Sequence, residues 1–600
     1  MTPAFRYTLL WLAGSLLAMF AALAMISAAY VNGEFLPSNA DAFYHARRVL
    51  DSLFSGSPVI QFDERIHAPE GSWLVWPWGF DTMLTSITRL FGPYASEAEA
   101  NRVLMNIPPA AVSIAVGLVV IIARQLALPF FLAVLFVMSF AALPLVYIQF
   151  AVGNVDHHFA ELLWTLGTLS AGIWFFSTNR LSYGAGITLG CVLGSAIAIH
   201  NGLFILQVPV AVTLGLFWLR GFPLPHRHQV MAFGAALLTT ALLVCLPSEP
   251  WQRGFFEFYT LSWFHFYIAA CVAVFSILLV FIERNTRNVV ILLLSVAAAT
   301  LPVIGAAGLA GEFISGQLDS IRNIGEARSP YTIHPELGAF GFTRFTSGLL
   351  LLTGPMLLLN IWWIYHRKEP VLQFVAIVSV MGLALMQSQY RFSVFADVPM
   401  LLTPILAARF FCESRPELRR MALAACCALF AVAFYPTLAN WKAFYALGGS
   451  HAYASARSVF PALEKACAQR PGIVLGDLDT GHWVRYHSQC SVIADVFLLT
   501  PQQTAKVIES SRLLAGPPAQ LLTAKPEVRY VFAHHSVPVT RDENGVETPN
   551  LDELRLQMQH VERDLLGPEA NIPPQFKRLW ETRTPQGQIY ARLYEIERTP

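Results

Sequence analysis

Thirteen long apolar stretches, separated by short polar turns, run through the first 440 residues of the chain. About 20 apolar residues in a helix cross the roughly 30 Å hydrocarbon core of a bilayer. The stretches therefore predict an α-helical polytopic membrane domain with about thirteen transmembrane helices. The predicted spans are 7–30, 101–123, 125–147, 159–176, 181–199, 202–219, 229–246, 255–282, 288–310, 345–365, 371–386, 395–411 and 421–435.

Charge separates the last 160 residues from the rest of the chain. Only 13% of the 600 residues are charged, against about 25% in an ordinary soluble domain. Residues 441–600 nevertheless hold 17 basic and 17 acidic residues, and they mix short β-branched runs with helical stretches. We predict a transmembrane domain at 1–440, with long outer loops at 31–100 and 311–344, followed by a small soluble extracytoplasmic α/β domain at 441–600.

Positive charge indicates the orientation in the membrane. Loops on the side expected to face the cytoplasm carry Arg6, Arg124, Arg180, Arg220, Arg227, Arg284, Arg287, Arg367, Lys368, Arg415, Arg419 and Arg420. The short turns on the opposite side supply only Arg253 and Arg391. We expect a cytoplasmic N-terminus and, because the span count is odd, an outer C-terminal domain. The first stretch, ending in MISAAY, could instead be a cleaved secretory signal, and the remaining topology would be the same.

Several classes of function do not fit the composition. The net charge of +1 gives no sign of a nucleic-acid partner, and no glycine-rich phosphate loop is present.

Six of the eight cysteines lie in or beside apolar spans. Cys467 and Cys490 fall in the expected outer domain, where an oxidising compartment would permit a disulfide.

Ionisable residues gather beside the outer ends of the predicted spans. Asp41 lies in NADAFYHARR, Asp156 and His158 lie in VDHHFAELLW, Glu326 lies in NIGEARSP, and Arg391 lies in QYRF. A carboxylate just outside a span is usually a solvated interfacial group. The Asp-His-His turn is less ordinary, because charges between two apolar helices must be paired, coordinated or placed in a cavity. Carboxylates with an imidazole suit Mg²⁺ or Mn²⁺ better than a thiol-bound zinc site.

The motifs resemble those of the catalytic subunits of oligosaccharyltransferases, above all the single-subunit archaeal and bacterial forms with a C-type glycosyltransferase fold. NADAFYHARR is similar to the first acidic motif of that family, and GNVDHHFAELL to the Asp-x-His version of the second. NIGEARSP resembles the glutamate segment of the fifth outer loop, and QYRF resembles the Val-Arg-Phe turn. The likeness extends over most of the chain.

The resemblance implies roles for individual residues. Asp41, Asp156 and His158 would be metal ligands for Mn²⁺ or Mg²⁺, with Asp41 also catalytic. Glu326 would contact the metal, the acceptor amide or both, and Arg391 would bind the lipid pyrophosphate.

The fifth-loop carboxylate has a second candidate. Glu336 in TIHPEL could take this role in place of Glu326. We prefer Glu326 because Pro330 follows it near the spacing of the family motif.

One motif departs from the family pattern. The family segment WWDYG reads the hydroxyl of the Ser or Thr two places after the acceptor Asn, whereas this chain has DLDTG. Asp479 and Gly481 match acceptor-binding positions, and both tryptophans are missing. The acceptor is therefore left open between an asparagine amide and a hydroxyl.

The function implied is metal-dependent, inverting transfer of an oligosaccharide from a polyprenyl-pyrophosphate donor to an acceptor protein or peptide, at the outer membrane face. The sequence does not reveal partner subunits. A first alternative is a related enzyme that moves one sugar from a polyprenyl phosphate to Ser, Thr or a lipid. A lesser alternative is a non-enzymatic lipid or solute transporter, which would place its charges near the bilayer midplane instead of at one face.

Overall fold

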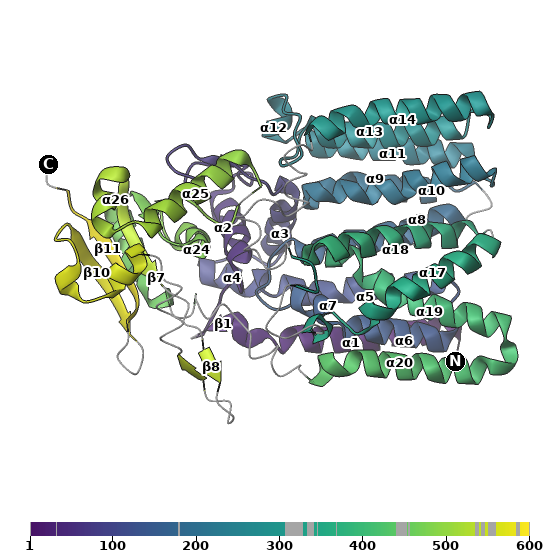
Figure 1. Cartoon of the computed structure of the whole chain (residues 1–600), viewed down its shortest axis with the longest axis horizontal. Coiled ribbons are helices and arrows are strands. Elements are labelled where there is room, and N and C mark those ends of the chain that lie inside the picture. The colour runs from purple at the N-terminus through teal and green to yellow at the C-terminus, as the bar shows by residue number, and fades with distance from the viewer. Residues whose placement is uncertain are drawn as a thin grey trace. The chain divides into compact units, whose positions relative to one another are not determined.

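Helices dominate the computed structural model of the chain (Figure 1). It describes residues 2–31, 33–177, 181–306, 328–332, 341–344, 346–367, 369–439, 453, 456–497, 499–534, 539–541, 547–549, 560–583 and 589–598. Clustering of contacts divides the chain into two compact units. Unit 1 holds residues 1–26, 75–83 and 106–446, and unit 2 holds residues 27–74, 84–105 and 447–600.

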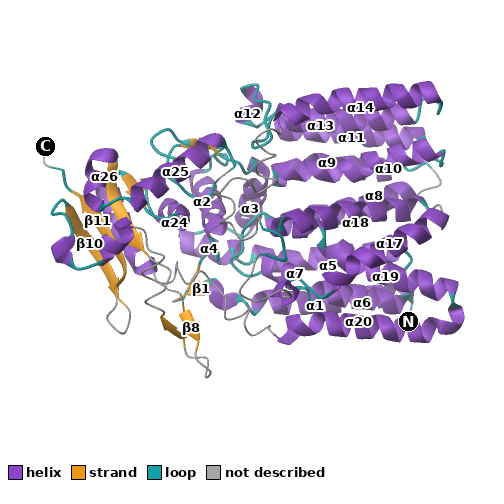
Figure 2. Ribbon diagram, viewed as in Figure 1, coloured by secondary structure: helices purple, strands orange, loops and turns teal. Residues whose placement is uncertain are grey.

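The helices of unit 1 are mostly long and apolar, and the long ones run side by side (Figure 2). They are α1 (Pro3–Leu23), α5 (Ile107–Gln125), α6 (Phe130–Ala141), α7 (Pro144–Gln149), α8 (His158–Ser177), α9 (Tyr183–Ile199), α10 (Gln207–Arg220), α11 (Arg227–Cys245), α12 (Glu249–Gln252), α13 (Trp263–Leu279), α14 (Thr286–Ala306), α17 (Leu349–Arg367), α18 (Pro370–Ser388), α19 (Asp397–Ser414) and α20 (Arg419–Ala439). Short 3₁₀ helices include η2 (Asn201–Leu206), η5 (Gly341–Arg344), η6 (Tyr390–Phe395) and η7 (Pro416–Leu418).

Nine helices in the described part of the chain are long and apolar enough to cross a membrane, and three shorter apolar helices accompany them. The prediction of a multi-pass membrane protein is thus confirmed, while the count of thirteen spans stays a prediction. The stretch at 125–147 forms two helices because Pro144, which lacks a backbone N–H, begins α7. The stretch at 202–219 begins as the 3₁₀ helix η2 before α10.

The packing of α9 depends on small residues. Gly186, Gly190 and Gly194 recur every four residues on α9, and a Cβ at any of them would collide with α11 backbone or side-chain atoms. Close helix approach through such a stripe is common in membranes, where van der Waals contact drives association. α9 also packs against α8. These contacts fix the end of α9 relative to the start of α8.

Unit 2 contains a five-stranded mixed sheet. Its order is β10 (Phe576–Arg583), β11 (Ile589–Ile596), β7 (Val528–His534), β5 (Ile473–Leu475) and β6 (Ser491–Val492). β5 pairs parallel with β6 and β7, and β11 pairs antiparallel with β7 and β10. The helices of this part are η8 (Arg457–Val459), α23 (Phe460–Gln469), α24 (Leu478–His487), α25 (Pro501–Ala515), α26 (Pro518–Ala524), α28 (His560–Leu566) and η9 (Glu569–Asn571), and β8 (Val539–Arg541) pairs with β9 (Glu547–Pro549).

Most of the predicted first outer loop, residues 31–100, also belongs to unit 2, and we call these residues the first outer segment. Unit 2 here holds β1 (Tyr30–Val31), β2 (Glu34–Phe35), α2 (Ala40–Ser55), β3 (Phe62–Asp63), β4 (Ser72–Trp73) and α4 (Glu97–Leu104), while η1 (Ile26–Ala28) and α3 (Trp78–Leu90) have residues in both units. α2 packs against α24. The Ala68 N–H donates to the Val492 carbonyl at 2.9 Å, and the Val492 N–H donates to the Arg65 carbonyl at 2.8 Å. This stretch therefore pairs like a strand beside β6.

Cys467 and Cys490 form a disulfide in unit 2, with their Cα atoms 5.5 Å apart. The pairing permitted by the sequence is thus present. It ties the end of α23 to the residue just before β6.

Candidate functional site

The Asp-His-His turn lies at the end of the loop between α7 and α8 in unit 1, and hydrogen bonds within the loop hold its shape. Gly153 has φ of +80°, a left-handed conformation that glycine adopts without a Cβ clash. The Asn154 side chain donates to the carbonyls of Ile148 and Gln149 at 3.0 and 3.2 Å. These bonds turn the chain back so that Asp156 is buried directly before α8.

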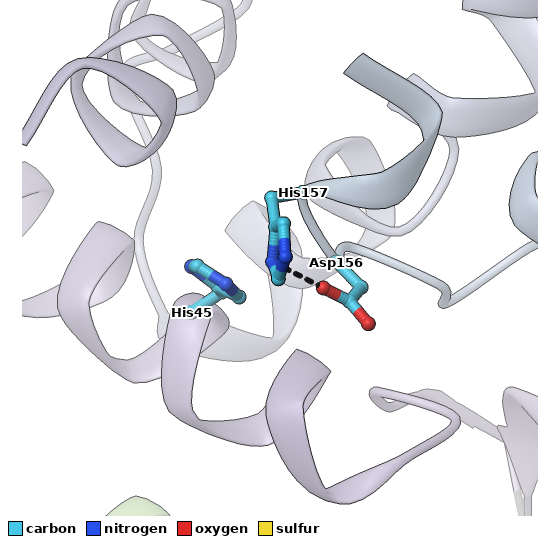
Figure 3. Close-up of side chains that lie close together, drawn as sticks. All are labelled: His45, Asp156 and His157. Atoms are coloured by element: carbon cyan, nitrogen blue, oxygen red, sulfur yellow. Dashed lines mark ion pairs between the residues drawn. The ribbon is translucent and has the colours of Figure 1, made fainter. Parts of the chain in front are cut away.

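The predicted ligands Asp156 and His158 lie next to each other in this turn. Asp156 Oδ2 is 3.8 Å from His158 Nε2, and its other oxygen, Oδ1, is 2.7 Å from Nδ1 of the intervening His157 (Figure 3). The His157 and His158 ring centroids are 4.4 Å apart. The Asp-x-His spacing thus places one carboxylate against two imidazoles.

Two further residues complete this cluster, and neither was predicted. Glu161 Oε2 lies 2.8 Å from His158 Nδ1, one helical turn earlier on α8. The second oxygen of Glu161 lies 2.9 Å from Nδ1 of His200, the residue that ends α9. The His200 ring stacks on His157 at 4.7 Å with an interplanar angle of 12°. We refer to Asp156, His157, His158, Glu161 and His200 as the second-motif cluster.

The second-motif cluster has donors that suit a divalent cation. His157, His158 and Glu161 each offer a ligand atom, and these atoms lie within 4.8 Å of one another. Mn²⁺ and Zn²⁺ bind carboxylate oxygens together with imidazole nitrogens, and carboxylate oxygens also suit Mg²⁺. The residues present therefore fit the metal that the sequence motifs imply.

Asp41 lies in the first turn of α2 in unit 2. Asn39 caps this helix, with its side chain accepting from the Ala42 N–H at 2.8 Å. About a quarter of the Asp41 side chain is exposed, and Oδ1 lies 3.7 Å from Nδ1 of His482. A carboxylate near a helix N-terminus is favoured by the helix dipole. The first acidic motif thus presents a partly exposed carboxylate on a rigid element.

Arg391 lies in η6, which packs against α8 and α18 in unit 1. The N–H of the preceding Tyr390 donates to the Arg328 carbonyl at 2.8 Å. The end of the NIGEARSP motif therefore lies beside the arginine turn. Glu326 and Glu336 fall outside the described residues.

The DLDTG segment forms the N-terminus of α24. Asp477 is the N-cap, and its Oδ1 accepts from the Thr480 N–H at 2.8 Å. Asp479 is exposed in the first turn, whereas Gly481 is buried where a Cβ would collide with Ala494 and Asp495. Capping explains Asp477 and Thr480, and close packing explains Gly481.

Comparison of the fold with solved structures identifies its class. The archaeal oligosaccharyltransferase AglB from Archaeoglobus fulgidus, in complex with an inhibitory peptide and a dolichol-phosphate, matches with a TM-score of 0.78 at 14% identity. The match covers 96% of this chain and 80% of that one. The chain has the oligosaccharyltransferase fold. The fold indicated by the acidic motifs is therefore confirmed.

Two further structures share this oligosaccharyltransferase fold or part of it. The Archaeoglobus fulgidus enzyme complexed with Zn and sulfate matches with a TM-score of 0.71 at 14% identity, covering 96% of this chain and 79% of that one. The arabinofuranosyltransferase AftD from Mycobacteria matches with a TM-score of 0.51 at 12% identity, covering 100% of this chain and 42% of that one. No protein-family model and no curated protein sequence matches the chain.

Proposed function

We propose that this protein is a membrane oligosaccharyltransferase. It transfers a glycan from a polyprenyl-pyrophosphate donor to an asparagine of an acceptor protein or peptide, with inversion at the anomeric carbon. The active site faces the extracytoplasmic side, where the C-terminal residues also lie. The observation that carries the proposal is the Asp156-x-His158 pair at the start of α8, set in an oligosaccharyltransferase fold.

The second-motif cluster supports metal dependence. Asp156 and His158, together with Asp41, would hold Mn²⁺ or Mg²⁺, and Glu326 would complete the set. Glu161 orients His158 by binding its Nδ1, which leaves Nε2 directed toward Asp156. Partners of this kind fix the tautomer and orientation of an imidazole ligand. When bound, the divalent cation would act as a Lewis acid on the departing pyrophosphate.

The remaining residues act on the donor and the acceptor. Arg391 would pair with the phosphate oxygens, because a guanidinium matches their geometry bidentately. Asp41 and Glu326 would each accept one N–H of the acceptor amide and favour its rotation out of conjugation. The amide nitrogen would then bond to the anomeric carbon as the bond from that carbon to the pyrophosphate oxygen breaks, which inverts the anomeric centre, and one N–H proton would pass to the carboxylate that accepts it.

The test is peptide glycosylation by the purified full-length protein. The assay supplies a polyprenyl-pyrophosphate-linked oligosaccharide, Mn²⁺ and a fluorescent peptide that contains an Asn-x-Thr sequence. We expect transfer by the wild type, and a loss of at least about 100-fold in D156A and H158A without loss of folded protein. Glu413→Gln is the control, because the Glu413 carboxylate, which pairs with Arg409, is partly exposed. Full activity of D156A and H158A would contradict the proposal.

A second candidate differs in its acceptor and donor. The DLDTG segment is a helix cap in place of the WWDYG motif, so the expected readers of a peptide hydroxyl are missing. A hydroxyl acceptor with a polyprenyl-phosphate donor would need no amide activation, and Asp41 would then act as a general base. Replacing Asn by Gln in the peptide, with each of the two donors supplied in turn, distinguishes the two candidates, since only the first loses its product.

A further inference from the structure

Unit 2 contains a buried line of acids and imidazoles that ends at Asp41. It runs from His67 through Asp495 to His482, and the side chains of all three are fully buried. They come from the first outer segment, from the residues after β6 and from α24. A buried charged or polar side chain costs free energy unless it is paired, so a line of three needs an explanation.

His482 is directed at the start of α2. Its Nδ1 lies 3.1 Å from the Ala40 carbonyl oxygen and 3.7 Å from Asp41 Oδ1. Its Nε2 lies 3.5 Å from Asp495 Oδ2. Both ring nitrogens therefore face oxygen acceptors, and the Nδ1–H donates to the backbone of the residue just before Asp41.

Asp495 is held from the other side by His67. The His67 Nε2 lies 3.2 Å from Asp495 Oδ1. His67 has φ of +53°, a left-handed conformation that is costly for a residue with a Cβ. The strand-like hydrogen bond of Ala68 to Val492 and the bond from Lys506 Nζ to the Ala68 carbonyl at 3.1 Å keep it there.

Aromatic side chains pack against the His482 ring. The Tyr44 and Phe497 rings lie 4.9 Å from it, and the Tyr44 hydroxyl donates to Asp63 at 2.8 Å. Gly481 lets Asp495 approach α24 directly. The imidazole is thus packed between two aromatic rings, with one edge toward α2 and the other toward Asp495.

We propose that His482, held by Asp495 and His67, is a positioning residue for Asp41. The C-terminal part of the chain would thereby orient the carboxylate of the first acidic motif. This inference rests on the proposed function, because it assigns His482 an effect on metal binding and transfer through Asp41. The two nitrogens have separable tasks: Nδ1 fixes the start of α2, and Nε2 keeps the ring in place.

Two substitutions in the full-length protein separate these tasks. The amide nitrogen of an asparagine can occupy the place of Nδ1, and that of a glutamine can occupy the place of Nε2. His482→Asn should therefore retain the bond to Ala40, while His482→Gln should lose it. His487→Asn is the matched control. His487 lies on the same helix, and this substitution removes the bond between its Nε2 and the Tyr453 hydroxyl, which are 3.0 Å apart.

The readouts are Mn²⁺ affinity by electron paramagnetic resonance, kcat and KM for peptide transfer, and Tm. For H482Q we expect Mn²⁺ affinity and kcat to fall by about 10- to 100-fold with little change in KM, and H482N to stay within about threefold of wild type. If H482N and H482Q lose Mn²⁺ affinity and kcat equally, and Tm falls in both, the inference would be overturned. If the wild type is active, D41N is inactive and H482Q has normal activity, this inference would be overturned while the proposed function would stand. A wild type without transfer would overturn the proposed function and this inference together.

Discussion

The Glu161 carboxylate lies 2.9 Å from Nδ1 of His200, which joins the first turn of α8 to the end of α9 in unit 1. The same carboxylate binds His158 through its other oxygen. Glu161 therefore connects a predicted metal ligand to a second helix, and the stripe of glycines on α9 holds that helix in place. The cluster depends on helix packing as much as on its own sequence motif.

Removing this bridge should weaken metal binding. Glu161→Gln keeps the shape of the side chain but offers one oxygen acceptor where the carboxylate offers two. We expect the Mn²⁺ concentration for half-maximal transfer to rise by at least about tenfold, and Tm to change little. E413Q should behave as wild type. An unchanged Mn²⁺ dependence in E161Q would contradict a role for Glu161 in orienting His158.

Metal removal should abolish activity. Treatment of the purified protein with a chelator is expected to stop peptide transfer, and added Mn²⁺ should restore it, because the second-motif cluster offers carboxylate and imidazole ligands. Product is measured by gel shift of the fluorescent peptide. Transfer that continues in excess chelator would contradict the metal assignment.

The Cys467–Cys490 disulfide should contribute substantially to the stability of unit 2. The two residues are 23 apart in sequence, and closing a loop of that length stabilises the folded state by about 3 kcal/mol in the chain-entropy model. We expect the C467A/C490A double variant to unfold at lower denaturant concentration, followed by tryptophan fluorescence. The C412A variant, at a free cysteine, is the control. Equal midpoints for wild type and the double variant would count against this contribution.

Acid should weaken unit 2 through Asp63. Burial alone would raise the pKa of Asp63, but the Arg485 guanidinium, 2.7 Å away, holds this pKa below its ordinary value. A carboxyl with a lowered folded-state pKa stabilises the fold above its unfolded pKa, and this stabilisation is lost as the pH falls through the folded value. We expect Tm to fall below about pH 4, and to fall less steeply in D63N.

The control for this prediction is Glu97→Gln. Glu97 pairs with Arg47 at 2.8 Å but is about half exposed, so its ion pair is screened by water. E97Q should follow the wild-type profile of Tm against pH. A D63N profile parallel to that of the wild type would show that another group controls acid stability.

Local patterns in the sequence were enough to indicate the main features of the fold. Apolar stretches near 20 residues predict membrane helices because the bilayer thickness sets their length. The Asp156-x-His158 spacing predicted a paired acid and imidazole because neighbours in a short turn must lie close together. Asp41 is recognisable from its motif, and the resemblance of such motifs to those of the oligosaccharyltransferase family implies the fold.

Contacts between distant segments could not be read from the sequence. His200 ends an apolar helix, and nothing near it in sequence indicates that Glu161 binds it. Likewise His482, Asp495 and His67 are separated by up to several hundred residues, and they meet only because α24 packs on α2 and the first outer segment pairs beside β6. The sequence by itself determined where the chain must be helical and apolar and which short motifs carry acids and imidazoles. Only the tertiary structure decided which of those polar groups share a buried site, because that choice follows from the packing of whole helices and sheet edges.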